Sequence, residues 1–143
     1  MNVHLRNIFP NDAPDIKSLT DQLGYSLSVA ETKEQIEEVL SAKDNIAFAA
    51  LDEQKIIGWV HGFKALRLES KPFVEIGGLV VDENYRGKGI GKKLVDQIKQ
   101  WGREKGIDDI RVRSQVKRKE AHQFYKSIGF AEVKEQKVFQ KSL

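Results

Sequence analysis

A glycine-rich run, Arg86-Gly87-Lys88-Gly89-Ile90-Gly91, separates two apolar segments of different periodicity. The segment before it, residues 73–81, is short and largely apolar, which predicts a buried strand. After the run, apolar side chains recur at helical spacing, and residues 109–114 then alternate as a second strand. The side chains at helical spacing are Ile90, Leu94, Val95, Ile98 and Trp101. A strand, a helix and a strand in this order predict a parallel pair joined by a right-handed crossover.

Glycines at a strand-to-helix junction favour an anion site. Backbone amides at a helix N-terminus point at a bound anion, the helix dipole favours negative charge, and glycine lets the ligand come close. Lys88 and Lys92 add positive charge at the rim. The run fits neither the dinucleotide fingerprint G-x-G-x-x-G nor the P-loop G-x-x-x-x-G-K-[ST]. It does fit R-x-x-G-x-G, read from Arg86 to Gly91.

The rest of the chain extends the same alternation of strands and helices. The remaining predicted elements are a strand near residues 3–5, a helix over 12–23, a helix capped by Thr32, strands over 46–51 and 56–65, a helix over 121–128 and a strand-like tail over 130–143. No linker or repeat interrupts them. We therefore expect an α/β fold with a mixed sheet, formed as a single domain over residues 1–143.

Composition excludes several classes of protein. The chain has 143 residues, 40% of them apolar and 31% charged, which is typical of a globular domain. No apolar stretch is long enough to cross a bilayer, the first residues lack the pattern of a signal peptide, and there are no cysteines. We expect a cytoplasmic protein without disulfides that does not act at membranes.

The charges and the polar motifs exclude further activities. The net charge of +3 is spread along the chain, and no helix-turn-helix or base-stacking platform is evident, so nucleic acid is not an expected partner. The histidines show no metal-ligand spacing, and no G-x-S-x-G occurs. We expect no metal and no serine-hydrolase chemistry.

Two motifs resemble those of a known family. The segment Leu79-Val80-Val81-Asp82-Glu83-Asn84-Tyr85, continued by the glycine run, is similar to the acetyl-CoA signature of the GNAT superfamily of N-acetyltransferases. The block from Ala121 to Phe130 resembles its A-x-x-F-Y-x-x-x-G-F motif. The resemblance covers nearly the whole chain. It implies a central mixed sheet flanked by about four helices, acetyl-CoA as co-substrate, and transfer to the primary amine of a small molecule or peptide by direct attack in a ternary complex. The alternative is a sensor that binds acetyl-CoA or CoA without turnover.

The resemblance also assigns residues to the coenzyme. The backbone of Leu79, Val80 and Val81 is expected to hold the pantetheine arm, and the Leu79 amide to polarise the thioester carbonyl. The amides expected to receive the pyrophosphate are those of Arg86, Gly87, Lys88, Gly89, Ile90, Gly91 and Lys92. Ser114 or Gln115 is placed to bond the pantetheine amides. Arg118 stands where many family members carry asparagine, and its guanidinium could reach a phosphate.

Catalysis needs an acid for the leaving thiolate and a base for the amine. Tyr125 matches the tyrosine that donates a hydrogen bond to the coenzyme A sulfur in many family members. The base stays open between Glu75, His61, His122 and water. By simple alternation, Glu75 shares a face with Gly77, Leu79 and Val81.

The acceptor is expected between the first two helices and the central strands. Tyr25, in the loop between those helices, and His61, on a neighbouring strand, are the expected contacts. The second helix is acidic, and its glutamates either attract a cationic amine or form a solvated face. Dimers are common in this family, so a homodimer is a further expectation.

Overall fold

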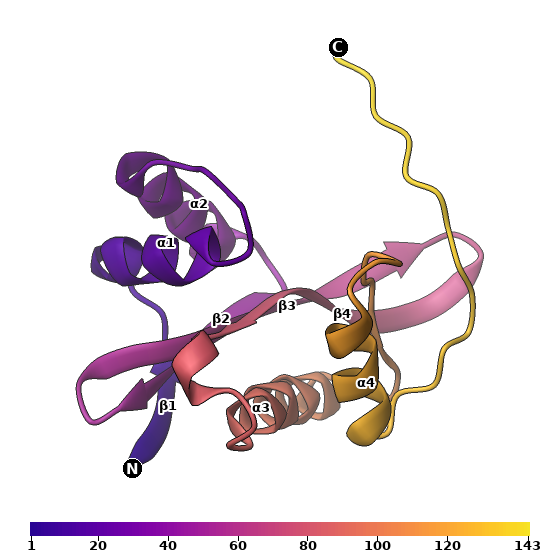
Figure 1. Ribbon diagram of the computed structural model, residues 1–143. Coiled ribbons are helices and arrows are strands. Elements are labelled where there is room, and N and C mark those ends of the chain that lie inside the picture. Colours follow the sequence, from indigo (N-terminus) through magenta and orange to yellow (C-terminus); the bar gives the residue numbers. More distant parts are fainter. The chain divides into compact units, whose positions relative to one another are not determined.

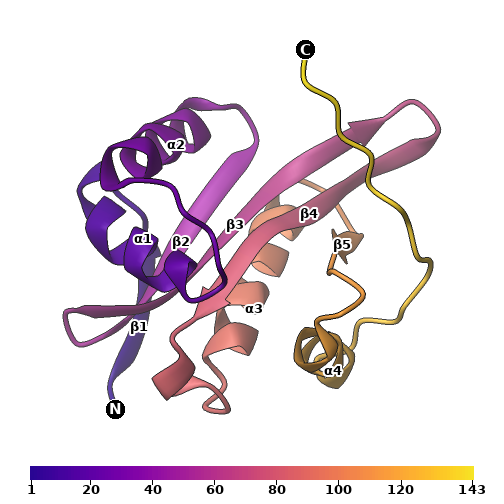
Figure 2. The same ribbon diagram turned by 45° about the horizontal axis from the view of Figure 1, so that its top comes forward.

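The computed structural model describes all 143 residues, which form two compact units, Met1–Val112 and Arg113–Leu143. The first unit holds a five-stranded sheet with the order β1-β2-β3-β4-β5 (Figure 2). The strands are β1 (Val3–Asn7), β2 (Asn45–Asp52), β3 (Lys55–Arg67), β4 (Ser70–Val81) and β5 (Ile110–Val112). All neighbours are antiparallel except β4 and β5, which are parallel. The predicted parallel pair is confirmed, and the two strands predicted over 46–51 and 56–65 form the antiparallel β2–β3 hairpin.

Helices cover both faces of this sheet (Figure 1). On one face lie α1 (Ala13–Asp21), which follows the short 3-10 turn η1 (Pro10–Asp12), and α2 (Val29–Ser41). On the other lies α3 (Ile90–Glu104), reached through a second turn, η2 (Glu83–Tyr85). The helix α4 (Lys119–Ser127) belongs to the second unit. The mixed sheet with four helices confirms the predicted fold class.

The second helix begins earlier than the sequence analysis placed it. Thr32 lies inside α2 and donates its hydroxyl to the Ser28 carbonyl at 2.9 Å. Ser28 is the actual cap: its hydroxyl accepts from the Glu31 amide at 3.0 Å, and the Glu31 carboxylate accepts from the Ser28 amide at 2.9 Å. This reciprocal capping box satisfies two donors that would otherwise lack partners, so it outcompetes a lone threonine as a start signal.

The packing of α3 depends on two glycines of β3. A Cβ at Gly62 would lie 2.9 Å from Ile98 Cδ1, and one at Gly58 would lie 3.3 Å from Leu94 Cδ1. Because neither glycine carries a side chain, the fully buried Leu94 and Ile98 press directly on the strand backbone. The N-terminal end of α3 is thereby fixed against the sheet, and Ile90, 1% exposed, anchors its first turn.

The tail was predicted to be strand-like, and this prediction is wrong. Residues 131–143 form no strand, and their amides make no backbone hydrogen bond. Val133, Val138 and Phe139 are exposed. Apolar alternation describes which residues a strand would present on one face, but it does not by itself supply the hydrogen-bonded neighbour that a strand needs.

Candidate active site

The β4 strand has a free edge over its last residues. The ladder between β4 and β5 ends at the pair Ile76 and Val112, whereas the ladder with β3 continues to Val81. From Gly77 to Val81, β4 therefore pairs on one side only. Unpaired backbone groups along such an edge can receive an extended ligand as an added strand. This is the position expected for the pantetheine arm, beside Leu79 and Val81.

A β-bulge lies at the start of this edge. His61 of β3 pairs with Gly78, and Gly62 pairs with Ile76, so that Gly77 is an extra residue on β4. A Cβ on Gly77 would stand 2.7 Å from His61 Nδ1, and a Cβ on Gly78 would stand 2.7 Å from the Trp59 ring. Both glycines thus face the α1–α2 side of the sheet. Glycine is required at both positions because the side chains of His61 and Trp59 come too close for a Cβ, and not because of the backbone conformation.

The bulge corrects the predicted placement of Glu75. Before the bulge, Glu75 pairs with Phe63 and shares the α1–α2 side with Gly77. After it, Leu79 and Val81 pair with residues of β3 that face α3, so they lie on the opposite side from Glu75. The prediction that all four residues share a face is wrong, because one inserted residue reverses the alternation that follows it.

The glycine run forms a loop that turns β4 into α3. Gly87 has φ +75° and Gly89 has φ +80°, a left-handed conformation that favours glycine. Gly89 is the N-cap of α3, and no amide from Gly87 to Lys92 donates to another backbone group. These donors, the exposed side chains of Arg86 and Lys88, and the positive end of the helix dipole suit a diphosphate. Lys92 forms an exposed ion pair with Asp96 at 2.8 Å, which leaves it free to exchange partners.

Asp82 is a positioning residue that the sequence analysis missed. Its amide donates to the Ile57 carbonyl at 2.8 Å, and its carboxylate accepts from the Asn84 amide at 2.9 Å. The residue is only 7% exposed, so it pins the end of β4 where the loop begins. The local signal was an aspartate two residues before an asparagine, a common turn arrangement.

The second unit carries the remaining predicted residues. Tyr125 is half-buried, with its ring centroid 5.1 Å from that of Phe124 and 5.5 Å from that of Phe130. Burial raises the pKa of Tyr125, and the charge of Arg118 opposes that rise, so the phenol keeps its proton at neutral pH. A protonated phenol is a hydrogen-bond donor.

Ser114 and His122, in the same unit as Tyr125, differ in whether their polar atoms already have a hydrogen-bond partner. The buried Ser114 hydroxyl has no hydrogen-bond partner, so it is able to form a hydrogen bond with an amide of a bound ligand. His122 Nε2, by contrast, lies 2.8 Å from the Gln115 carbonyl, so this nitrogen is the protonated one and the ring tethers the segment before α4.

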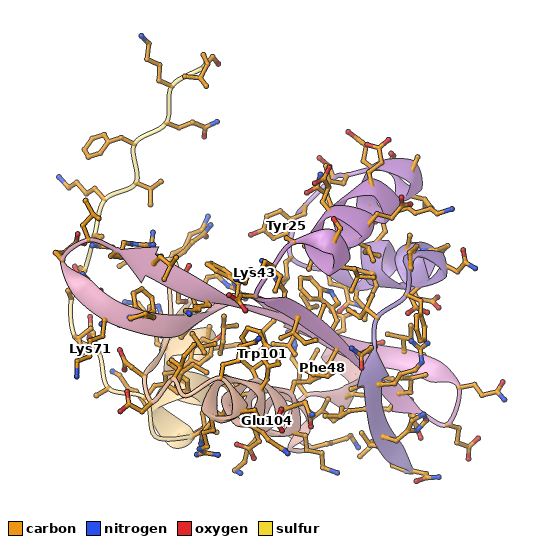
Figure 3. The ribbon with its side chains drawn as sticks, turned by 180° about the vertical axis from the view of Figure 1, so that it is seen from behind. Tyr25, Lys43, Phe48, Lys71, Trp101 and Glu104 are labelled. Carbon is orange, nitrogen blue, oxygen red and sulfur yellow. The ribbon has the colours of Figure 1, made fainter.

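A cavity of about 190 Å³ lies between the α1–α2 pair and the sheet, on the same face as the glycines of the bulge. Its lining includes His61 and Trp59 of β3 and Leu27 of the α1–α2 loop. Tyr25 is 58% exposed and does not line the cavity. Figure 3 shows Tyr25 on the α1–α2 side of the sheet and Trp101 on the α3 side.

The acidic residues of α2 do not reach this cavity. Every glutamate of the helix is exposed, and none belongs to the lining; these residues are Glu31, Glu34, Glu37 and Glu38. Of the two interpretations of this acidic pattern, the structure favours the solvated face.

The hydrogen bonds of His61 define its tautomer. Asn45 Nδ2 donates to the Lys43 carbonyl at 3.1 Å, so Asn45 Oδ1 faces His61 Nε2, 2.8 Å away. An amide oxygen only accepts, so Nε2 carries the proton and Nδ1 carries a lone pair. That Nδ1 is the atom that approaches Gly77. Burial lowers the pKa of His61, which keeps the ring neutral near pH 7.

Among the described residues, no cluster of three His, Asp or Glu side chains could hold a metal ion. No helix is both long enough and apolar enough to span a bilayer.

Comparison with known proteins decides the family. The family model described as acetyltransferase (GNAT) matches residues 13–130, a range that includes the free β4 edge, the glycine loop and Tyr125. The chain belongs to this family. It is an acetyl-CoA-dependent N-acetyltransferase, as the motifs predicted. Its residues fit the coenzyme: loop amides suit the diphosphate, and the free strand edge suits the amide-bearing arm.

Individual relatives of this acetyltransferase include antibiotic-modifying enzymes. An aminoglycoside N(6′)-acetyltransferase type 1 from Stenotrophomonas maltophilia is 26% identical over 136 residues, which is 90% of this chain and 86% of that protein. The solved structure of aminoglycoside N-acetyltransferase AAC(6′)-Iy with CoA superposes with a TM-score of 0.88 at 20% identity, covering 99% of this chain and 96% of that one. An aminoglycoside acetyltransferase from an uncultured soil sample, solved with sisomicin, gives 0.81 at 26% identity, with the same coverages of 99% and 96%.

Proposed function

We propose that this acetyltransferase moves the acetyl group of acetyl-CoA to the primary amine of a small molecule or peptide by direct attack within a ternary complex. The observation that carries the proposal is the bulge at Gly77 and Gly78, where two candidate sites meet. The free β4 edge begins there, and the cavity residues His61 and Trp59 pack on the same two glycines. An acyl donor on the edge and an amine in the cavity would face each other without an enzyme-bound intermediate. The aminoglycoside acetyltransferase solved with sisomicin, an amine, supports an amine acceptor.

The coenzyme is proposed to bind through backbone groups. Leu79, Val80 and Val81 would hold the pantetheine arm, since this stretch of β4 has no β5 partner. The proposed diphosphate donors are the amides of Arg86, Gly87, Lys88, Gly89, Ile90, Gly91 and Lys92. Ser114, whose hydroxyl lacks a partner, would bond a pantetheine amide, and Arg118 would add charge for a phosphate. The family match spans both units, which supports one acetyltransferase domain over residues 1–143.

The chemistry needs two proton movements. The neutral amine attacks the thioester carbonyl carbon, a C–N bond forms, and the carbonyl oxygen takes negative charge that the Leu79 amide can stabilise. The amine nitrogen then loses a proton to a base. As the C–S bond breaks, the sulfur takes a proton from the Tyr125 hydroxyl, and solvent returns it to the phenolate. The products are an N-acetylated amine and coenzyme A.

Two groups on the α1–α2 side are candidates for the base, Glu75 and His61. The geometry favours His61, because its Nδ1, which carries the lone pair, lies close to Gly77 at the start of the free edge, and burial lowers its pKa. A neutral imidazole can accept a proton near pH 7 without repelling an arriving ammonium group. Glu75 already has an interaction of its own, and its carboxylate would draw the ammonium form toward the bulge. Tyr25, exposed on the same side of the sheet, would contact the acceptor at the rim.

A thiol-release assay tests the proposed function. Purified protein is mixed with acetyl-CoA and a panel of alkylamines, diamines, amino acids, sisomicin and peptides with free N-termini. We expect free coenzyme A and an equal amount of a product heavier by one acetyl group, detected by mass spectrometry. Acetyl-CoA binding without thiol release for any amine would contradict the proposal and support the sensor.

A further inference from the structure

The cavity beside His61 is apolar, and this property indicates which amines it can accept. We propose that the acceptor is a primary amine with an apolar body about the size of one benzene ring or a six-carbon chain, lodged between α1, α2 and the sheet. The proposal rests on the transferase function above and names its substrate class. It excludes polycationic, polyhydroxylated amines such as sisomicin as preferred substrates, despite the aminoglycoside relatives.

Most of the lining is apolar; besides its two threonines and the Lys17–Asp21 pair, its polar groups are Gln35, His61 and Trp59 Nε1, a buried donor without a hydrogen-bond partner. Its apolar side chains include Ile16, Leu27, Ile36, Val39, Leu40 and Ala47. The threonines in the lining are satisfied within their own helices: Thr20 donates to the Ile16 carbonyl at 2.7 Å and Thr32 to the Ser28 carbonyl at 2.9 Å. Burying the carbon atoms of a ligand against such a surface is favourable. The surface offers too few hydrogen-bond partners to offset the free-energy cost of desolvating a ligand with several hydroxyl groups.

The cavity also lacks a free carboxylate for a second ammonium group. Asp21 is the only acidic residue in the lining, and its carboxylate is paired with Lys17 at 2.7 Å. Because the Asp21 side chain is 45% exposed, this pair exchanges partners at little cost, but a second ammonium group lodged in the apolar part of the cavity would stand without a partner. A monoamine avoids this cost, because its single amino group points out of the cavity toward the bulge.

The size of the cavity sets the size of the apolar body. A dry cavity of about 150 Å³ lined by aliphatic and aromatic side chains is enough to bind benzene. The cavity here is somewhat larger, about 190 Å³. One ring or one short chain fits, and the Trp59 ring supplies an aromatic wall.

The position of the cavity directs the amino group. Trp59 and His61 belong to its lining, and they lie so close to Gly78 and Gly77, at the start of the free β4 edge, that a Cβ on either glycine would stand 2.7 Å from them. An amine whose carbon skeleton fills the space above Trp59 would present its nitrogen beside His61 Nδ1. The apolar body therefore acts as the anchor that brings the reacting nitrogen to the thioester.

Matched amines test the proposal by initial-rate kinetics at saturating acetyl-CoA. Propylamine and hexylamine differ by three methylenes, and each buried methylene is expected to raise kcat/KM about 4-fold, roughly 60-fold in all. Hexane-1,6-diamine has the same chain as hexylamine with a second charge, and we expect it and sisomicin to be much poorer substrates. 2-Phenylethylamine should match hexylamine. A wild-type preference for the diamine or for sisomicin would overturn the inference and leave the transferase function standing.

Variants of the lining make the test specific. Leu40 and Leu27 line the cavity and are 39% and 46% exposed, so Leu40→Asp and Leu27→Asp should fold. Each should narrow or reverse the preference for hexylamine over the diamine. Leu68→Asp, at a fully exposed leucine outside the cavity, is the control and should keep the wild-type preference. Ala47→Leu should fill part of the cavity and lower kcat/KM for hexylamine more than for propylamine, without a lower melting temperature. Equal preferences in all four variants would contradict the inference.

A binding measurement separates this inference from the proposed function. Hexylamine that binds the folded state raises the melting temperature without any turnover. A rise with hexylamine that is smaller in Leu40→Asp, together with no thiol release from any amine, would retain the cavity as a ligand site and reject the transferase function. No rise and no thiol release would reject both.

Discussion

Gly89 offers a direct test of the proposed diphosphate site. In Gly89→Ala, the new Cβ meets no atom within 4 Å, so crowding plays no part. The residue has φ +80°, and an L-amino acid in the left-handed region costs about 1–2 kcal/mol. The variant can keep this strain or relieve it by rotating the backbone, and rotation would move the first amides of α3 away from a bound diphosphate.

The size of the effect follows from that strain energy. If the strained loop is the only conformation that binds the coenzyme, its free energy rises by the same ~1–2 kcal/mol relative to the relaxed loop. The fraction of protein able to bind falls accordingly, and the Kd for acetyl-CoA rises about 5- to 30-fold. The midpoint of thermal unfolding should fall by roughly 3–10 °C. Gly106→Ala is the matched control, because Gly106 has φ +75° and also has open space around its Cβ. It follows the other end of the 15-residue α3, roughly 22 Å away.

Calorimetric titration with acetyl-CoA and thermal unfolding of both variants provide the measurement. We expect similar losses of stability in the two proteins, and weaker coenzyme binding in Gly89→Ala alone. A wild-type Kd in Gly89→Ala would refute the assignment of these amides to the diphosphate. Equal weakening in both variants would show that general loss of stability, and not the loop, causes the effect.

Three further substitutions test the proposed proton transfers and the bulge. Tyr125→Phe should lower kcat about 100-fold with little change in the Kd for acetyl-CoA; steady-state kinetics that match wild type would remove its role as acid. His61→Gln should lower kcat/KM by about the same factor, whereas His4→Gln at an exposed histidine should not. Because burial lowers the pKa of His61, the unfolded state binds its proton first, so stability should persist as pH falls to about 6.5 and decline below it, whereas activity should decline only at the lower pH where the folded protein protonates His61; a decline of either that begins well above pH 6.5 would contradict this reasoning. Gly77→Ala places a Cβ 2.7 Å from His61 Nδ1 and should lower both the melting temperature and kcat, and adding His61→Ala should restore part of the stability but not the activity.

Some errors of the sequence analysis share one origin in long-range pairing. The face assigned to Glu75 was wrong because the alternation rule counts residues along one strand, whereas the bulge at Gly77 arises from pairing with His61 on another. The tail was predicted to be a strand from its own alternation, yet residues 131–143 form no strand, because alternation carries no information about a pairing partner. The start of α2 was misplaced for a different reason, since the capping box Ser28-x-x-Glu31 was present in the sequence and was overlooked.

The sequence by itself determined the family, the order of the elements from the first strand to the last helix, and the loop at Gly87 and Gly89. Each of these depends on local information: the spacing of apolar residues, helix caps, and glycines that the backbone conformation demands. Only the tertiary structure decided where the β4–β5 ladder ends, which nitrogen of His61 carries the proton, and that an apolar cavity lies beside it. These features depend on groups far apart in the chain, such as Asn45 and His61 or Leu27 and Trp59. Their contacts exist only once the sheet has fixed the register of its strands and the helices have packed on it.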